Sequence, residues 1–193
     1  MSKLDNMTLE ELWQLFPIVL AEHNPEYAKW YDEEAQELLC LLAPYSVCRI
    51  NHIGSTAVKG LLAKPTVDIL LELPKDYQVD AVAEALLSND WLLMAQNAEE
   101  KLLDFNKGYT AQGFASKVFH LHIKPSGDWG ELYFRDYLLS RPDIAQQYAL
   151  LKQDLMKLHE HNRDAYTNAK TEFILQHTRH AQQAYAGRYI PDG

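Results

Sequence analysis

The sequence predicts a mixed α+β fold, in which a sheet flanked by helices is followed by an all-helical C-terminal third. Three observations carry this prediction. Short segments before residue 125 alternate apolar and polar residues and are rich in β-branched side chains. After residue 128, apolar residues instead recur every three to four positions. At 193 residues, the chain also has the length of one domain with a full hydrophobic core.

The first two predicted elements are helices with recognisable starts. Residues 8–11 (Thr-Leu-Glu-Glu) form a capping box, which predicts a short helix that stops at Pro17. Asn24 and Pro25 predict the start of a second helix, because proline fits the first helical position without losing a hydrogen bond. An amphipathic pattern then continues to Pro44, so one face of this helix is expected to pack inward.

The middle of the chain predicts strands separated by turns and one helix. Residues 47–53 alternate and predict a strand, and 54–64 predict a turn with a short helical piece. Residues 66–73 give the clearest strand pattern, because they are rich in β-formers and are followed by proline. A helix is expected over 79–88 and another strand over 91–96.

Residues 97–117 show no firm period, so we expect either a mobile loop or an irregular strand pair there. Strict alternation predicts a further strand over 118–124. Three helices are expected after it. The first is capped by Asp128, the second starts at 140–143, and the last runs from about residue 163 to 186.

Composition restricts the function classes. The formal net charge is −9, which disfavours long nucleic acid as a partner but is compatible with a small anionic ligand in a locally basic pocket. No segment has the run of about 18 apolar residues that a membrane helix needs. We find no secretory signal, and we expect Cys40 and Cys48 to be reduced and partly buried thiols. A cytoplasmic protein is therefore predicted.

One stretch has the residue types of a phosphate site. Gly54 and Ser55 follow the predicted strand 47–53, and such a turn offers backbone N–H groups and a hydroxyl to a phosphate. Asp68 lies in the next strand, where a carboxylate can hold Mg²⁺ against phosphate oxygens. Glycine–serine pairs are also common at ordinary turns, so this pattern alone is weak.

A wider set of residues makes the pattern specific. The first block is His52-Ile53-Gly54-Ser55-Thr56-Ala57-Val58, Gly60-Leu61, Ala63-Lys64-Pro65 and Val67-Asp68-Ile69-Leu70. The second is Phe134-Arg135-Asp136-Tyr137-Leu138, Pro142, Tyr148, Leu151-Lys152, Tyr166 and Lys170. Both blocks, in this order, resemble the signature of the GrpB family over about residues 22–175.

The resemblance implies a fold similar to that of DNA polymerase beta-like nucleotidyltransferases. It divides the single GrpB-like domain 1–193 into an extra N-terminal helix (1–21), an α/β nucleotidyltransferase-like core (22–127) and a helical C-terminal part (128–187). It also implies that Asp68 and Ser55 are the catalytic residues. Phosphate binding would fall to four residues: Gly54, Ser55, Thr56 and Lys64.

The sequence departs from that superfamily at the acidic pair. Those enzymes carry a second carboxylate two residues after the first, where this chain has Leu70. Glu72 shares the face of Asp68 in a regular strand but lies two residues farther along, roughly 7 Å by strand rise. The standard two-metal site therefore cannot be carried over.

His120 and His122 offer another ligand set. Alternation places both imidazoles on one face of the predicted strand 118–124, and with Asp68 they would suit Zn²⁺, Mn²⁺ or Fe²⁺ better than Mg²⁺. Protonated histidines could instead hold a phosphate. The expected cofactor is a divalent metal (Mg²⁺, Mn²⁺ or Zn²⁺), with Asp68, His120 and His122 as its ligands.

Four residues are predicted to support the site. His52 either bonds the Gly-Ser turn or packs beside it, and Glu72 lies near Asp68. Arg135 is expected to pair with Asp136 and tie the helical third to the sheet. Lys170 stands one helical turn after Tyr166, so both could face the cleft.

These residues predict a nucleotidyltransferase-fold protein that binds a nucleotide or another phosphorylated small molecule, with metal-dependent nucleotidyl transfer as the reaction if it is an enzyme. Two alternatives stay open: a non-catalytic binding module that has lost the second carboxylate, and a hydrolase with a single metal ion. Neither a membrane nor long nucleic acid is an expected partner, and the oligomeric state is not predicted.

Overall fold

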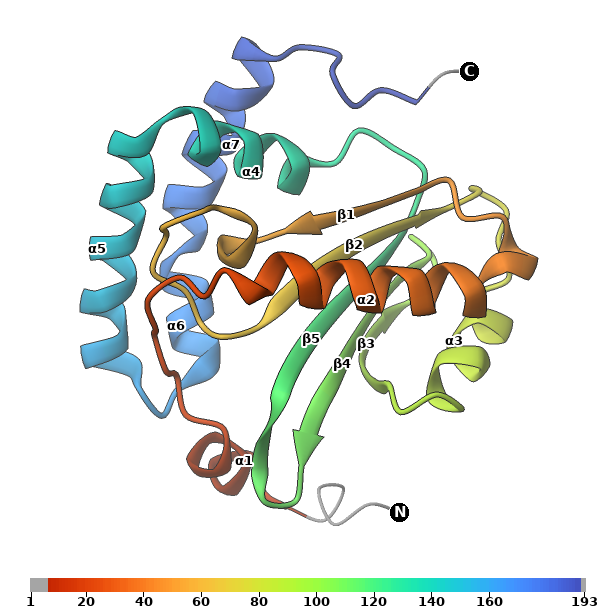
Figure 1. Cartoon of the computed structure of the whole chain (residues 1–193), viewed down its shortest axis with the longest axis horizontal. Coiled ribbons are helices and arrows are strands. Elements are labelled where there is room, and N and C mark those ends of the chain that lie inside the picture. Colours follow the sequence, from red (N-terminus) through yellow and green to blue (C-terminus); the bar gives the residue numbers. More distant parts are fainter. Residues whose placement is uncertain (1–6, 192–193) are drawn as a thin grey trace.

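The centre of the molecule is a five-stranded mixed sheet with the strand order β1-β2-β5-β4-β3 (Figure 1). The structure is a computed structural model that describes residues 7–191. Strands β2 and β5 are parallel, and the other neighbouring strands are antiparallel. The strands are β1 (Arg49–Ile53), β2 (Val67–Leu73), β3 (Leu92–Asn97), β4 (Leu102–Thr110) and β5 (Gly113–Pro125). This confirms the predicted mixed α+β fold.

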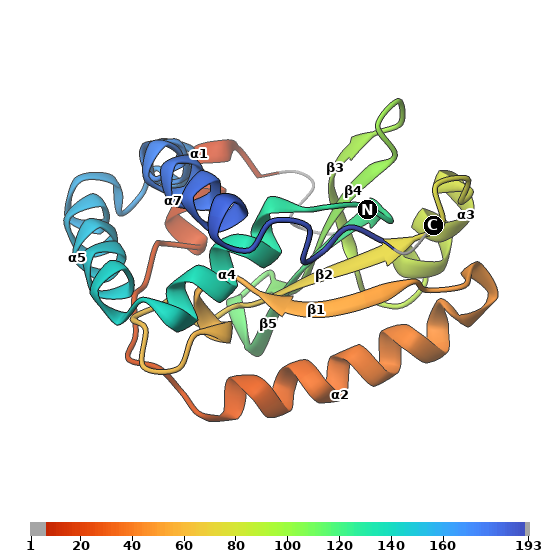
Figure 2. The ribbon, with the colours of Figure 1, turned by 90° about the horizontal axis from the view of Figure 1, so that it is seen from above.

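Helices cover both faces of the sheet. Figure 2 shows α2 below strands β1 and β2, with α4, α5 and α7 on the opposite side. Most of the polypeptide after the sheet is helical, as predicted. The helices are α1 (Leu9–Leu15), α2 (Glu26–Leu41), α3 (Val79–Leu87), α4 (Gly130–Ser140), α5 (Pro142–His159), α6 (Arg163–Ala169) and α7 (Thr171–Ala184), with short 3₁₀ turns η2 (Ala43–Tyr45) and η3 (Ser55–Ala57).

Alternation along β2 decides which residues can form a site. Val67, Ile69 and Leu71 are fully buried in one apolar cluster with residues of α2 and α3. Since successive side chains point to opposite faces, Asp68 and Leu70 point toward the C-terminal helices instead. Asp68 therefore lies where the helical third meets the sheet, at the edge of a pocket.

The predicted N-terminal helix is shorter than its segment 1–21. Helix α1 starts at the predicted capping box, in which Thr8 accepts a hydrogen bond from the Glu11 amide and Glu11 accepts one from the Thr8 amide. Residues 1–6 lie outside the described residues. Among residues 7–191, no helix is long and apolar enough to cross a membrane.

The region 97–117 is a strand pair and not a mobile loop. Strands β4 and β5 form an antiparallel hairpin whose register shifts between Lys107 and Tyr109. Gly108 sits at this irregularity with a φ of +90°, and a Cβ atom there would lie 2.3 Å from the Lys117 carbonyl oxygen. The irregularity breaks the alternation in the sequence, which explains why no period was visible.

Three smaller predictions need correction. The last helix is not continuous over 163–186, because α6 ends at Ala169 and α7 begins at Thr171. Trp129, not Asp128, occupies the N-cap of α4, and no side chain of residues 7–191 caps that position. Cys40 and Cys48 are free but exposed, because both lie on outward-facing positions and not on the apolar face of their segments.

Candidate functional site

A polar pocket opens between the sheet and the helical third. Its volume is about 570 Å³. It brings together residues from η3, β2, β5, α5 and α6, which lie far apart in the sequence. The predicted site residues that line it are Gly54, Ser55, Lys64, Asp68, His120, His122 and Lys170. The other lining residues are Thr66, Tyr148, Lys152, Arg163, Asp164, Tyr166, Thr167 and Asn168.

The turn after β1 requires glycine for two reasons. Gly54 has a φ of +70°, which L side chains rarely adopt. A Cβ atom at this position would also lie 2.2 Å from Oδ2 of Asp68. The backbone of Gly54 therefore passes directly against the Asp68 carboxylate and places Ser55 at the edge of the same pocket.

Asp68 and His120 form a hydrogen-bonded pair across β2 and β5. The Nδ1 atom of His120 lies 3.0 Å from Oδ1 of Asp68. Its Nε2 atom lies 2.8 Å from the Tyr109 hydroxyl and 3.2 Å from a guanidinium nitrogen of Arg163. Arginine can only donate, so Nε2 is the acceptor and Nδ1 carries the proton that is donated to Asp68.

The pKa shifts agree with this arrangement. Burial raises the pKa of Asp68, but the hydrogen bond from His120 and the nearby positive charges outweigh it, so the net pKa lies below the usual value. Burial lowers the pKa of His120 by more than its contact with Asp68 raises it. Near neutral pH the pair is therefore a carboxylate and a neutral imidazole.

His122 has a different carboxylate partner. Its Nδ1 atom lies 2.6 Å from Oδ1 of Asp104, a residue of β4. Burial lowers the pKa of His122, but the hydrogen bond to Asp104 and the surrounding carboxylates outweigh burial and raise the net pKa. Asp68 and both histidines line one pocket, yet among residues 7–191 no group of three His, Cys, Asp or Glu side chains is placed to hold a metal ion.

Lysines dominate the charge of the pocket. Burial lowers the pKa of Lys64 to about 7 and that of Lys152 to about 7. It also lowers the pKa of Lys170 to about 8. With Arg163, four cationic side chains line the pocket, against two carboxylates among its described lining residues, those of Asp68 and Asp164. This local balance is opposite in sign to the charge of the whole chain.

Lys152 and Tyr166 are the most buried polar residues of the pocket wall. Lys152 is 2% exposed, and its Nζ donates to Oγ of Ser55 at 2.9 Å and to the Leu62 carbonyl. Tyr166 is 1% exposed, and within the described residues its hydroxyl has no hydrogen-bond partner. A buried hydroxyl without a partner is costly, so a ligand atom in the pocket is its natural acceptor or donor.

Two predicted residues lie beside the pocket and not in it. Thr56, predicted to bind phosphate, is 2% exposed beneath the turn, where its hydroxyl donates to the Thr66 carbonyl at 3.0 Å. His52 points toward α2, stacks on Tyr31 and lies 3.0 Å from the Thr56 hydroxyl. Burial lowers the pKa of His52 to about 4, so it is neutral and supports the turn from the far face.

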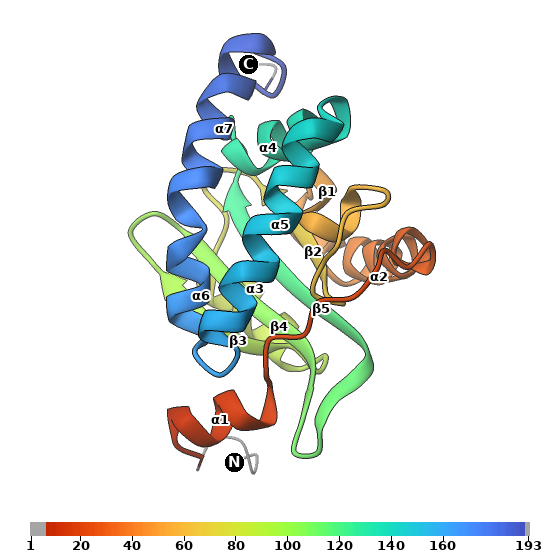
Figure 3. The same ribbon diagram turned by 90° about the vertical axis from the view of Figure 1, so that its left-hand side faces the viewer.

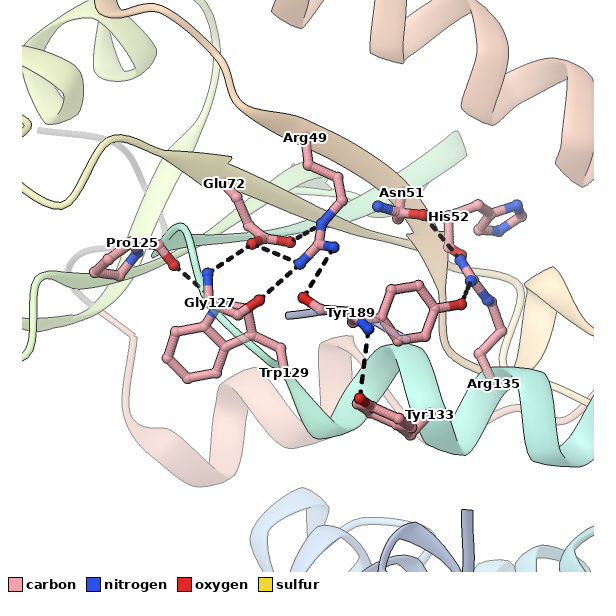
Figure 4. Close-up of polar contacts among 10 residues, drawn as sticks. All are labelled: Arg49, Asn51, His52, Glu72, Pro125, Gly127, Trp129, Tyr133, Arg135 and Tyr189. Atoms are coloured by element: carbon pink, nitrogen blue, oxygen red, sulfur yellow. Dashed lines mark hydrogen bonds and ion pairs between the residues drawn. The ribbon is translucent and has the colours of Figure 1, made fainter. Parts of the chain in front are cut away.

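Glu72 and Arg135 also hold the structure together (Figure 4). Glu72 is fully buried, pairs with Arg49 at 2.6 Å and accepts from the Gly127 amide at 3.0 Å. Arg135 donates to the His52 carbonyl at 3.0 Å and pairs with Asp136 at 2.8 Å. The predicted Arg135–Asp136 pair is present, but both residues belong to α4, so the hydrogen bond from Arg135 to the His52 carbonyl is what ties the helical third to the sheet. Glu72 does not replace the missing carboxylate.

The environment of Leu70 does not suit the second carboxylate that the nucleotidyltransferases carry at this position. Its side chain is fully buried against Ile53 and Leu132, and Leu132 belongs to α4. Helix α4 therefore covers the position at which a second carboxylate would have to reach solvent and a metal ion.

Sequence reasoning missed Lys152, Arg163 and Asp104 as site residues. Lys152 had a usable signal, because it follows Tyr148 by four positions and so lies on the apolar face of α5, where a lysine is unusual. Arg163 and Asp104 had none. The position of Asp104 depends on the pairing of β4 with β5, and that of Arg163 on the start of the short helix α6. The sequence pattern predicted neither feature.

Comparisons with known proteins agree with this architecture. The family model described as "GrpB protein" matches residues 17–180. A UPF0157 protein of Bacillus subtilis, YqkA, is 28% identical over 191 residues, which cover 96% of this chain and 54% of the relative. A UPF0157 protein of Pseudomonas aeruginosa is 32% identical over 154 residues, covering 79% of this chain and 63% of the relative. The matched part of this chain thus spans between about half and two thirds of the length of these relatives.

Solved structures show the same fold. The crystal structure of the conserved protein GrpB from Enterococcus faecalis has a TM-score of 0.73 at 26% identity and covers 86% of this chain and 99% of that one. A structure of Cid1 in complex with the UTP analog UMPNPP has a TM-score of 0.51 at 13% identity, covering 77% of this chain and 48% of that one. The sheet and its helices are therefore nucleotidyltransferase-like, and the chain belongs to the GrpB family.

Proposed function

We propose that the pocket binds a phosphorylated small molecule, whose phosphate groups lie between the Gly54–Ser55 turn and the cationic side chains of the helical third. The observation that carries the proposal is the charge of the pocket: Lys64, Lys152, Lys170 and Arg163 converge on one turn in a chain of net charge −9. Charge-assisted hydrogen bonds to phosphate are the strongest interactions such a set can make.

Two further features support an anionic ligand. The Tyr166 hydroxyl, which has no hydrogen-bond partner among residues 7–191, gains an acceptor when a phosphate oxygen enters the pocket. The lysines are held at pKa values near neutrality by burial and by one another, and an anion would raise those pKa values by supplying the missing negative charge. The Cid1 structure with a similar fold holds a UTP analogue, which agrees with a phosphate-bearing ligand here.

The predicted divalent metal does not fit the donor set. Asp68 uses Oδ1 for His120, and Oδ2 faces the Gly54 backbone. Leu70 occupies the second carboxylate position, and cationic side chains surround the remaining space. The geometry therefore supports the binding module over metal-dependent transfer or a single-metal hydrolase. A cytoplasmic location remains a prediction.

Isothermal titration with inorganic tripolyphosphate tests the proposal. Wild type should bind it without added metal, and Lys170→Met should weaken binding by about tenfold, the effect of one charged hydrogen bond. Lys29→Met is the matched control, because Lys29 lies on the exposed surface of α2 with 67% of its side chain accessible, and it should bind like wild type.

Two results would contradict this proposal. One is the absence of binding, or equal binding by the two lysine variants. The other is Mg²⁺-dependent release of pyrophosphate from a nucleoside triphosphate that disappears in Asp68→Ala, which would instead support nucleotidyl transfer.

A further inference from the structure

A second pocket continues from the first. It has a volume of about 660 Å³ and shares His120, His122, Arg163 and Asp164 with the cationic pocket. Arg163 forms the junction, because its guanidinium lies 5.5 Å from the centre of the Tyr109 ring, a wall of the second pocket, and 3.2 Å from His120, a wall of both. A ligand can therefore span the two pockets past Arg163.

The walls of this second pocket are mainly apolar and aromatic. We call it the aromatic annexe, and its principal walls are Leu12, Trp13, Phe16, Leu92, Leu93 and Tyr109. Helix α1 supplies one wall, and its C-terminal end is fixed by Phe16, whose ring centre lies 4.8 Å from that of Tyr109. The amide of Ile18 adds a hydrogen bond of 3.0 Å to the Glu160 carbonyl, just before α6. Figure 3 shows α1 below α6, beside the strands.

The base of the annexe is polar. Asn106 is 6% exposed and lies opposite His120 in the register of β4 and β5. Asp104 is its neighbour on the same face of β4, and both residues line the annexe. An alkyl chain would cover these groups without offering them a hydrogen bond, which is unfavourable. A planar heterocycle presents apolar faces to the walls and polar edges to Asn106 and Asp104.

From this geometry we infer that the annexe binds the aromatic part of the same ligand, so that the phosphorylated molecule is a phosphate ester of a planar heterocycle, as in a nucleotide. The inference rests on the proposed function, because the phosphates are placed in the cationic pocket. It adds a role for α1, which precedes the family match at residue 17. Helix α1 contributes the aromatic side chain of Trp13 to the annexe, and this side chain stacks on the ring of the ligand.

The experiment compares ligands with and without the ring. The four common ribonucleoside triphosphates, tripolyphosphate and decyl diphosphate are titrated into wild type, all without metal. At least one nucleotide should bind about tenfold or more tightly than tripolyphosphate, the gain expected for one stacked base. Decyl diphosphate should show no such gain.

Variants of α1 locate the effect. Trp13→Ala should remove the nucleotide's advantage and leave tripolyphosphate binding unchanged, whereas Trp13→Phe should keep most of it. Gln14→Ala is the control on the same helix, because Gln14 is exposed and does not line the annexe. No residue of α1 is buried, so these variants should keep the wild-type melting temperature.

The outcomes separate the inference from the function on which it rests. Equal binding of nucleotides and tripolyphosphate, or an equal loss of both in Trp13→Ala, overturns the annexe alone. If decyl diphosphate binds more tightly than any nucleotide, the annexe binds an alkyl group and not a heterocycle, and the inference is also wrong. If no polyphosphate binds at all, both the proposed function and the inference are wrong.

Discussion

At the scale of single residues, Gly54 links the turn to the acid. Its positive φ lets the backbone reverse after β1, and its missing Cβ lets the chain pass against Asp68. These two requirements for glycine are independent. A positive φ is unfavourable for any residue with a Cβ atom, whereas the steric overlap arises only because the Asp68 carboxylate lies next to Gly54. Gly60 makes the comparison possible: its φ is +79°, yet in the described part of the chain no atom lies within 4 Å of the position that its Cβ would take.

Gly54→Ala should therefore destabilise the protein more than Gly60→Ala. For Gly60→Ala we expect a loss of about 1 kcal/mol in the free energy of unfolding from backbone strain alone. For Gly54→Ala the overlap with Asp68 adds about 1–3 kcal/mol. Urea denaturation measures both values.

A double variant checks the cause. In an Asp68→Ala background the carboxylate is gone, so most of the extra loss in Gly54→Ala should disappear. Equal losses for the two glycine variants, or an unchanged difference without Asp68, would show that the carboxylate does not set the requirement for glycine.

At the scale of elements, strand β2 separates the core from the site. Its even-numbered positions carry Asp68, Leu70 and Glu72 on one face, and each has a different environment: a pocket, a helix and a buried ion pair. Only Asp68 reaches the pocket. The order of residues in this strand therefore places one carboxylate in the pocket and not two.

Leu70→Asp tests this reading directly. If α4 seals the position, the new carboxylate is buried beside Ile53 and Leu132 without a partner, and the free energy of unfolding should fall by about 3 kcal/mol or more. Leu70→Met keeps the volume and should lose less than about 1.5 kcal/mol. A stable Leu70→Asp protein that gains Mg²⁺-dependent ligand binding would show instead that the second carboxylate site is intact.

The elements were predictable wherever one periodicity dominated. The strand 66–73, the capping box before α1 and the turn at Gly54 follow from local patterns, and the structure has all three. The β4–β5 hairpin could not be predicted from a local pattern, because the irregularity at Gly108 interrupts the alternation of apolar and polar residues. The break between α6 and α7 has no proline or glycine to mark it, yet it brings both Arg163 and Lys170 to the pocket.

The candidate site was predictable in part for the same reason. Asp68, His120 and Ser55 lie on elements that the sequence defines, and they share the pocket. Lys152 and Arg163 arrive from helices whose docking on the sheet is a long-range property. His122 bonds to Asp104 and not to Asp68, and this contact depends on the register between β4 and β5. Residue identity alone could not distinguish a metal site from a cationic one.

At the scale of the whole molecule, the cationic pocket links ligand binding to pH. The pKa of Lys64 and that of Lys152 are lowered to about 7, and that of Lys170 to about 8, from an ordinary value near 10.5. Between about pH 7 and pH 10 the unfolded chain holds protons that the folded protein has released. Stability contributed by these groups therefore rises with pH in this window.

The free energy of unfolding of ligand-free protein should thus increase between pH 7 and pH 9. One lysine with a pKa of about 7 contributes up to about 2 kcal/mol of this increase. Lys152→Met removes such a group, so its stability should change less over the same interval. Identical pH slopes for wild type and Lys152→Met would contradict the lowered pKa.

Tripolyphosphate should reverse the trend, because it binds the protonated lysines. Its stabilising effect on the melting temperature should be larger at pH 7 than at pH 9, since at the higher pH binding must also recover the lost protons. The polyphosphate keeps or gains negative charge over this range, so its own ionisation works against the expected loss and cannot produce it. An increase in ligand-induced stabilisation toward pH 9 would mean that the lysines are charged throughout and that burial does not control the pocket.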